Sequence, residues 1–302
     1  YGGAFKVAHG LSTAFPDRVL TTPISEAGIV GVATGMALRG LRPIVEIMFG
    51  DFVTLVADQI INHAAKFETM YNRTVTVPLV VRTPMGGGRG YGPTHSQTLD
   101  KLFLGVPHLR LVAPSVYHRP GSLLRTATLA DDGVVLFVEH KLLYPTQLVL
   151  DHTPPVFVEA REDDGGYPTA VVRNSTSGAP DVCVITYGGS TLRLHRLLAE
   201  LAAEEIRVTL CVPSCIQPLP LTHLTAEAAR ARRVVVVEEG TGAHGWGAEV
   251  AATLSSSLWG QLDAPIRRVA AKNTVVPAAR ALEDEVLPSD RTIEDAILGV
   301  LA

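Results

Sequence analysis

Residues 22–31 read Thr22-Pro23-Ile24-Ser25-Glu26-Ala27-Gly28-Ile29-Val30-Gly31. The stretch predicts the start of a helix, because Ser25 is a good N-cap residue and an acidic residue suits the first turn. The rest of the helix is small and apolar, so Glu26 places a lone carboxylate at the positive end of the helix dipole, close to water-poor surroundings. Capping alone would explain this charge, and catalysis is the alternative.

Beyond this stretch, short β-rich apolar runs alternate with helical patterns along the chain. This alternation is typical of an α/β fold, and we predict two open, mostly parallel sheets covered by helices. In the first half we expect strands at 44–48, 75–81, 109–113 and 134–138, and helices at 26–38, 52–66 and 121–129.

The composition of the sequence changes between about residues 148 and 180, where acidic, glycine-rich and serine-rich segments are typical of turns and linkers. We therefore predict a first domain over residues 1–150, a linker over 151–180 and a second α/β domain over 181–302. In the second domain we expect strands at 182–186, 208–212, 234–237 and 266–269, and helices at 191–204, 247–258 and 292–301.

The composition is that of a globular protein, with 302 residues, 47% hydrophobic and 19% charged. A formal net charge of −4 argues against nucleic acid as the main partner. No apolar run reaches the roughly 18 residues of a membrane span, so we expect no membrane partner. The three cysteines, Cys183, Cys211 and Cys215, do not form a disulfide framework and suit a core in a reducing cytoplasm. The chain starts at Tyr1 without a methionine, so we expect it to be part of a longer protein.

A glycine-rich segment, Gly-Gly-Gly-Arg-Gly-Tyr-Gly-Pro-Thr-His-Ser-Gln, occupies residues 86–97. It lacks the Gly-Lys-Ser/Thr ending of a phosphate-binding P-loop, which excludes that reading. It follows an expected strand, and open α/β sheets bind ligands at the carboxyl ends of their strands. Although a lone histidine is more often structural, this position makes His95 a candidate catalytic residue.

Two further features near the first strand allow more than one interpretation. Phe49 and Phe52 could be ordinary core residues or could offer a flat face to a heteroaromatic ring. In the following helix, a polar stripe with i, i+4 spacing is typical of a solvated face. The helix also carries a second row of polar residues, and polar residues on two faces indicate burial against another chain instead. The stripe consists of Thr54, Asp58, Asn62 and Lys66.

Taken together, the sequence resembles the β subunit of the thiamine-diphosphate-dependent first component of 2-oxo acid dehydrogenase complexes. This transketolase-like family includes pyruvate, branched-chain and acetoin dehydrogenases. The likeness runs in order through nearly the whole chain, in segments 2–7, 18–20, 23–31, 40–46, 58–66, 95–97, 139–144 and 247–251. It implies a transketolase-like pyrimidine-binding domain followed by a transketolase C-terminal-like domain, with the family's first strand and helix lying before Tyr1.

The resemblance also implies roles for individual residues. Glu26 matches the glutamate that pairs with the aminopyrimidine ring of thiamine diphosphate, where a carboxyl group in a dry site can share a proton with a ring nitrogen. Phe52 matches the aromatic residue that stacks on that ring, and Ile24 lines the same pocket. His95 matches an active-site histidine suited to proton transfer or to orienting a lipoyl acceptor.

In some relatives, backbone carbonyls bind a structural monovalent cation, so the resemblance implies a possible K⁺ site in this chain. Such ligands leave little trace in side chains, and only Asp131 offers recognisable support. The matching positions are Leu79, Thr128, Leu129, Asp131 and Gly133.

Relatives bind the diphosphate through Mg²⁺ held by a Gly-Asp-Gly segment, which this chain does not contain. We therefore expect an α subunit that holds Mg²⁺ and the diphosphate, an α₂β₂ assembly, and transfer of the acyl group from a small 2-oxo acid to a lipoyl acyltransferase core. The alternatives are an acyloin- or ketol-forming enzyme and a non-catalytic scaffold subunit. A eukaryotic source would change the expected compartment to the mitochondrial matrix, and we expect His244 to be a turn or interface residue.

Overall fold

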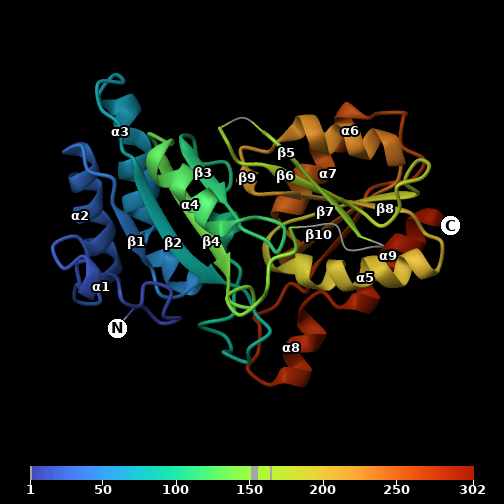
Figure 1. Cartoon of the computed structure of the whole chain (residues 1–302), viewed down its shortest axis with the longest axis horizontal. Helices are drawn as coiled ribbons and strands as arrows, with labels where there is room; N and C mark the ends of the chain where they lie inside the picture. The colour runs from blue at the N-terminus through green and yellow to red at the C-terminus, as the bar shows by residue number, and fades with distance from the viewer. Residues whose placement is uncertain (1, 151–155, 164) are drawn as a thin grey trace.

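The computed structural model describes residues 2–150, 156–163 and 165–302. Within them, two open sheets with helices on both faces confirm the predicted fold class (Figure 1). The first sheet has the order β1-β2-β4-β3-β9, in which β1, β2, β4 and β3 are parallel. Its strands are β1 (Ile44–Glu46), β2 (Leu79–Met85), β3 (Leu109–Val112), β4 (Val134–His140) and β9 (Cys215–Gln217).

The interior strand β2 begins four residues later than the sequence predicted, at Leu79 instead of residue 75. It follows Pro78, which cannot donate a ladder hydrogen bond and therefore suits the position before a strand. The strand continues to Met85, which is paired with His140 of β4, so that β2 and β4 end side by side. This shared end positions the candidate site.

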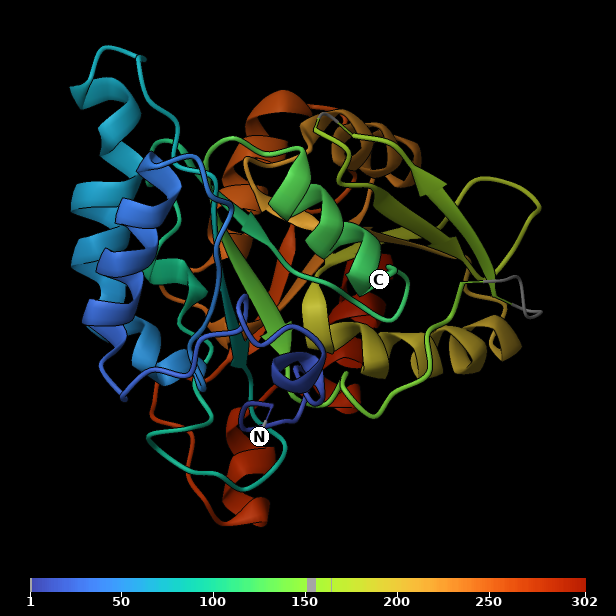
Figure 2. The ribbon, with the colours of Figure 1, turned by 60° about the vertical axis from the view of Figure 1, so that its left-hand side comes forward.

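Around the first sheet, one predicted helix differs from the structure, and two short helical elements, Leu11–Ala14 and Asp100–Leu102, were not predicted. The single helix expected over residues 52–66 is instead a 3₁₀ helix, a π-helical segment and an α-helix in succession. Figure 2 shows this composite helix beside α2 on the outer edge of the molecule. The elements are α1 (Leu11–Ala14), α2 (Glu26–Leu38), η1 (Gly50–Val56), η2 (Gln59–Ala64), α3 (Ala65–Met70), η3 (Asp100–Leu102) and α4 (Pro120–Leu129).

The second sheet has the order β11-β10-β7-β8-β6-β5, and its first four strands are parallel. Helices α6 and α7 cover one face and α5 and α9 the other (Figure 1). The strands are β5 (Phe157–Arg161), β6 (Thr169–Arg173), β7 (Val182–Thr186), β8 (Val208–Pro213), β10 (Val234–Thr241) and β11 (Arg267–Ala271). The helical elements are η4 (Gly188–Ser190), α5 (Thr191–Ala203), α6 (Leu221–Ala231), α7 (Trp246–Ser257), α8 (Arg280–Val286) and α9 (Asp290–Leu301).

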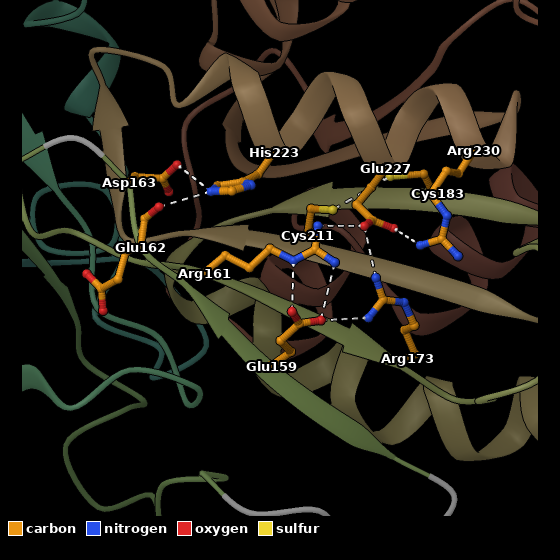
Figure 3. Close-up of polar contacts among 10 residues, drawn as sticks. All are labelled: Glu159, Arg161, Glu162, Asp163, Arg173, Cys183, Cys211, His223, Glu227 and Arg230. Carbon is orange, nitrogen blue, oxygen red and sulfur yellow. Dashed lines mark hydrogen bonds and ion pairs between the residues drawn. The ribbon is translucent and has the colours of Figure 1, made fainter.

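Residues 151–180 were expected to form a linker, but part of this segment belongs to the second sheet. Residues 151–155 and 164 lie outside the described part of the chain, but β5 and β6 form an antiparallel hairpin that pairs with β8. Three arginines, Arg161, Arg173 and Arg230, bind the buried carboxylate of Glu227 on α6, each at 2.8–2.9 Å (Figure 3). Tertiary contacts thus make this polar segment part of the second sheet.

The two sheets are joined rather than separate. Strand β9 follows β8 in the chain but pairs antiparallel with β3 of the first sheet. One apolar core extends from Val30 on α2 to Trp246 on α7, and the indole of Trp246 donates a hydrogen bond to the Ile216 carbonyl on β9 at 3.1 Å. In the described residues, no helix is both long and apolar enough to cross a membrane.

Candidate functional site

The glycine-rich segment follows the carboxyl end of β2, and Lys141 follows the carboxyl end of β4. The Lys141 amide donates to the Met85 carbonyl at 3.2 Å, which keeps the two strand ends in register. Residues 86–95, here called the glycine loop, leave this edge and return to it at His95. The geometry therefore places the loop at the edge of the sheet where α/β proteins bind ligands.

His95 lies against two of the aromatic residues that the sequence singled out. Its ring is edge-on to Phe49 with centroids 4.5 Å apart, and to Phe52 with centroids 5.3 Å apart. The Thr94 hydroxyl lies 2.8 Å from Nδ1 of His95, which leaves Nε2 to face a ligand. Phe49 also contacts Tyr91 of the loop, with centroids 6.0 Å apart. The site thus has a half-exposed imidazole on an aromatic wall.

Lys141 lies beneath the loop and is fully buried. Its ammonium donates to the Gly86 carbonyl at 2.6 Å and to the His95 carbonyl, so one side chain binds both ends of the loop. It also lies over the rings of Phe49 and Tyr91, at 5.7 and 5.9 Å from their centroids. Burial lowers the pKa of Lys141 to about 8, although nearby Asp51 opposes the shift.

A buried pair joins the two sheets at the same edge. His140, the last residue of β4, lies 2.7 Å from a carboxylate oxygen of Glu239 on β10. The Leu142 amide donates to His140 Nδ1 at 3.2 Å, which assigns the proton to Nε2, facing Glu239. Burial would raise the pKa of Glu239, but His140 and the Gly87 amide lower it to about 2. Glu239 is therefore a fixed anion.

The second domain also binds the middle of the glycine loop. Glu239 accepts from the Gly87 amide at 2.8 Å. Glu283, which is buried on α8, accepts from the amides of Gly88 and Gly90 at 2.8 and 3.0 Å. Gly88 and Gly90 have φ values of 81° and 69°, a conformation that glycine adopts without strain. Two carboxylates of the second domain thus fix a loop of the first.

Glu26 and Ile24 lie at the start of α2, on a different element from His95 and Phe52. Glu26 is partly exposed at the start of α2, and Ile24 is 77% exposed. Ser25 takes the N-cap position, yet its side chain makes no capping bond. In the part of the chain that the structure describes, the Glu26 carboxylate makes no hydrogen bond or ion pair, so capping does not use it. Helix α2 packs against η1, which carries Phe52.

These positions fit the pyrimidine end of thiamine diphosphate. An unpaired carboxylate is ordinary in the first turn of a helix, but an exposed apolar side chain beside it suits a site that another molecule completes. A second acidic group lies on η1, which packs against α2: one oxygen of Asp51 is buried and finds no hydrogen-bond partner among the described residues. Burial raises the pKa of Asp51, against the field of Lys141.

The carbonyls expected to bind a monovalent cation already have a cationic partner. Arg42 donates from Nη1 to the Thr128 carbonyl at 3.1 Å and to the Asp131 carbonyl at 2.7 Å, and from Nη2 to Asp132. The Asp131 side chain pairs with Arg110 at 3.1 Å. The Gly133 carbonyl accepts from the Leu79 amide at 3.3 Å. These contacts do not favour a bound ion, and K⁺ at this position stays a prediction.

The structure also shows the positions of the three cysteines and of His244. All three cysteines are buried and unpaired in the core, as predicted, with Cys183 Sγ and Cys211 Sγ 3.9 Å apart (Figure 3). His244 lies exposed in the turn between β10 and α7 with φ of 55°, so it is a turn residue.

Comparisons with known proteins agree with this arrangement. Residues 1–147 match the family "Transketolase, pyrimidine binding domain", and residues 172–293 match "Transketolase, C-terminal domain". The pyruvate dehydrogenase E1 component subunit beta-1, mitochondrial, of Arabidopsis thaliana is 34% identical over 94% of this chain and 76% of its own length. The chain belongs to the family of transketolase-like dehydrogenase E1 β subunits.

Other members of this family show how varied its substrates are. The chain is also 34% identical to the beta subunit of acetoin:2,6-dichlorophenolindophenol oxidoreductase of Cupriavidus necator, over 94% of this chain and 80% of that protein. It is equally similar to the 2-oxoisovalerate dehydrogenase subunit beta of Pseudomonas aeruginosa, over 93% and 81%. These E1 β subunits are thiamine-diphosphate-dependent, and the family implies a decarboxylase subunit with an α-subunit partner.

A solved structure supports the fold alone. A chain described as "Split gene transketolase, inactive beta4 tetramer" superimposes with a TM-score of 0.72 at 19% identity, and the match covers 97% of this chain and 86% of that one.

Three charged residues that hold the glycine loop, Lys141, Glu239 and Glu283, were not among the site residues predicted from the sequence. Lys141 was within a segment that carried the family likeness, and a lysine three residues after the apolar run 134–138 is a signal for a cation close to the core. Glu239 and Glu283 gave no such signal, because their partners are backbone amides about 150 and 195 residues away.

Proposed function

We propose that this chain supplies the pyrimidine half of a thiamine diphosphate site in a 2-oxo acid dehydrogenase, with Glu26 as the carboxylate that acts on the aminopyrimidine. The observation that carries the proposal is the unpaired Glu26 carboxylate at the start of α2, beside the exposed Ile24. When bound, the cofactor supplies the carbanion and the electron sink for loss of carbon dioxide. The chain's own residues hold and orient it.

Glu26 would share a proton with the ring nitrogen. Phe52, half-buried on η1, would offer its face to the ring. Ile24 would exclude water from the same side. Such a dry environment strengthens the bond between the carboxylate and the ring nitrogen.

His95 would act on the substrate side of the site. Its Nδ1 is held by Thr94, so Nε2 can donate or accept a proton at the oxygen of a bound 2-oxo acid or orient a lipoyl acceptor. The aromatic wall of Phe49 and Phe52 keeps the imidazole in place. The proposal includes transfer of the acyl group to a lipoyl carrier, and the relatives' names as dehydrogenase subunits support an oxidative reaction.

We further propose that an α subunit with a Gly-Asp-Gly segment holds Mg²⁺ and the diphosphate, in an α₂β₂ assembly with a lipoyl acyltransferase core. Exposed apolar side chains on the outer helices support this partner: Val32 on α2 is 65% exposed and Leu55 on η1 is 54% exposed. The polar stripe lies on the same composite helix, with Asn62 bonded to Asp58 at 2.9 Å and to Lys66 at 2.8 Å. A preorganised polar row beside apolar residues suits a subunit contact.

The test is Glu26→Gln in the complex reconstituted with its α subunit. We expect decarboxylation of the preferred 2-oxo acid to fall by about 10²–10⁴-fold, as for loss of an acid–base group. Glu249→Gln is the matched control, because Glu249 also lies exposed in the first turn of a helix, α7. Retained turnover in Glu26→Gln would instead identify a scaffold subunit, and formation of a carbon–carbon bond in place of lipoamide acylation would identify an acyloin-forming enzyme.

A further inference from the structure

We propose that Lys141 is a positioning residue for His95: its buried ammonium holds both ends of the glycine loop and thereby sets the place of the imidazole. The inference rests on the proposed role of His95 at the active site. It concerns how this site is assembled.

The geometry of the loop supports this role. Residues 86 and 95 are the two ends of a ten-residue loop, and the same Nζ atom binds the carbonyl oxygens of both. One ammonium therefore replaces the strand partner that each end loses at the sheet edge. Because the His95 carbonyl is fixed, the imidazole can move only by rotation about its own side-chain bonds.

The surroundings of Lys141 support this role, because the direct hydrogen-bond partners of its ammonium are the two ends of the loop. A fully buried lysine is rare unless it is paired, yet the described residues give it no carboxylate within ion-pair distance. Its direct partners are the two carbonyls and the aromatic faces of Phe49 and Tyr91. A methionine of similar length would fill this space but leave both carbonyls without a donor.

Charged groups from every neighbouring element influence the ammonium at longer range. Asp51 on η1, Glu239 on β10 and Glu283 on α8 favour its charge, whereas Arg89 in the loop opposes it. His95, His140 and Tyr91 are further titratable groups beside it. Since the pKa of Lys141 is about 8, its charge-assisted bonds to the loop weaken as the pH rises above that value.

The first experiment measures hydrogen exchange of the full-length chain and does not depend on activity. In Lys141→Met we expect amides of residues 86–95 to exchange at least about 10-fold faster, while β7 and β8 keep their protection. Lys101→Met is the matched control, because Lys101 also bonds backbone carbonyls, those of Thr241 and Ala243, away from the loop. Unchanged exchange in the loop of Lys141→Met would overturn the proposal, and Lys141→Arg, which keeps a donor, should restore part of the protection.

The second experiment measures turnover in the reconstituted complex. We expect kcat of Lys141→Met to fall by about 100-fold with KM nearly unchanged, since a displaced catalytic group affects the chemical step. The activity of the wild type should fall as the pH rises above about 8, and this alkaline fall in activity should be absent from Lys141→Met. In Asp51→Asn the fall should begin at a lower pH, because Asp51 raises the pKa of Lys141. Wild-type kcat and an unchanged alkaline fall in activity in Lys141→Met would overturn the proposal. If the wild-type complex decarboxylates no 2-oxo acid, the proposed function fails, while the exchange experiment still decides the role of Lys141.

Discussion

The buried pair between His140 and Glu239 gives a quantitative prediction for the substitution Glu239→Gln. Folding lowers the pKa of Glu239 from 4.5 to about 2, because His140 outweighs the cost of burial. At about 1.4 kcal/mol for each tenfold change in acidity, this corresponds to about 3–4 kcal/mol of stability at pH 7.

The pH dependence of this effect has a definite direction. Because folding lowers the pKa, Glu239 contributes its full stabilisation above the unfolded value of 4.5 and loses it as the pH falls toward 2. The free-energy difference between wild type and Glu239→Gln should therefore be constant from pH 7 to about pH 5 and shrink in more acidic solution.

Urea denaturation of both proteins at several pH values between 3 and 7 measures this difference. Glu285→Gln is the control, because Glu285 forms an exposed pair with Lys272 at 3.3 Å and should cost less than about 0.5 kcal/mol. A cost for Glu239→Gln below about 1 kcal/mol at pH 7, or a cost that grows as the pH falls, would refute the reasoning.

Two further predictions concern the arginine clusters. Arg42→Ala should lower stability by about 1–2 kcal/mol, since two carbonyls lose a charged donor, and KCl should restore more of the melting temperature than choline chloride does. A wild-type melting temperature that itself rises in KCl would show that an ion binds beside Arg42. Glu227→Ala should cost about 3–5 kcal/mol in urea denaturation, because three arginines lose their shared buried anion (Figure 3). A cost near that of Arg291→Ala, an exposed control, would contradict this.

The repeated pattern of the sequence was sufficient for the fold class. Apolar runs such as 134–138 and 182–186 are buried strands, because parallel strands covered on both faces need continuous hydrophobic residues. Helix α2 spans residues 26–38, as predicted from Ser25 and Glu26. These features are local, and local propensity and periodicity decide them.

Polar segments were predicted less well. The hairpin of β5 and β6 looked like a linker because Glu159, Arg161 and Arg173 are charged, and its strands are explained only by the partner Glu227 on α6. Glu283 could not be recognised for the same reason, because its partners lie in a distant loop, and its helix α8 was not predicted.

The sequence by itself determined two α/β units, a carboxylate at the start of α2 and a histidine after a glycine loop. Only the tertiary structure decided that Lys141 joins the ends of this loop and that Glu239 and Glu283 bind its centre. The physical reason is that strand and helix formation depend on neighbouring residues, whereas a buried charge is stable only where distant chain segments supply its partners.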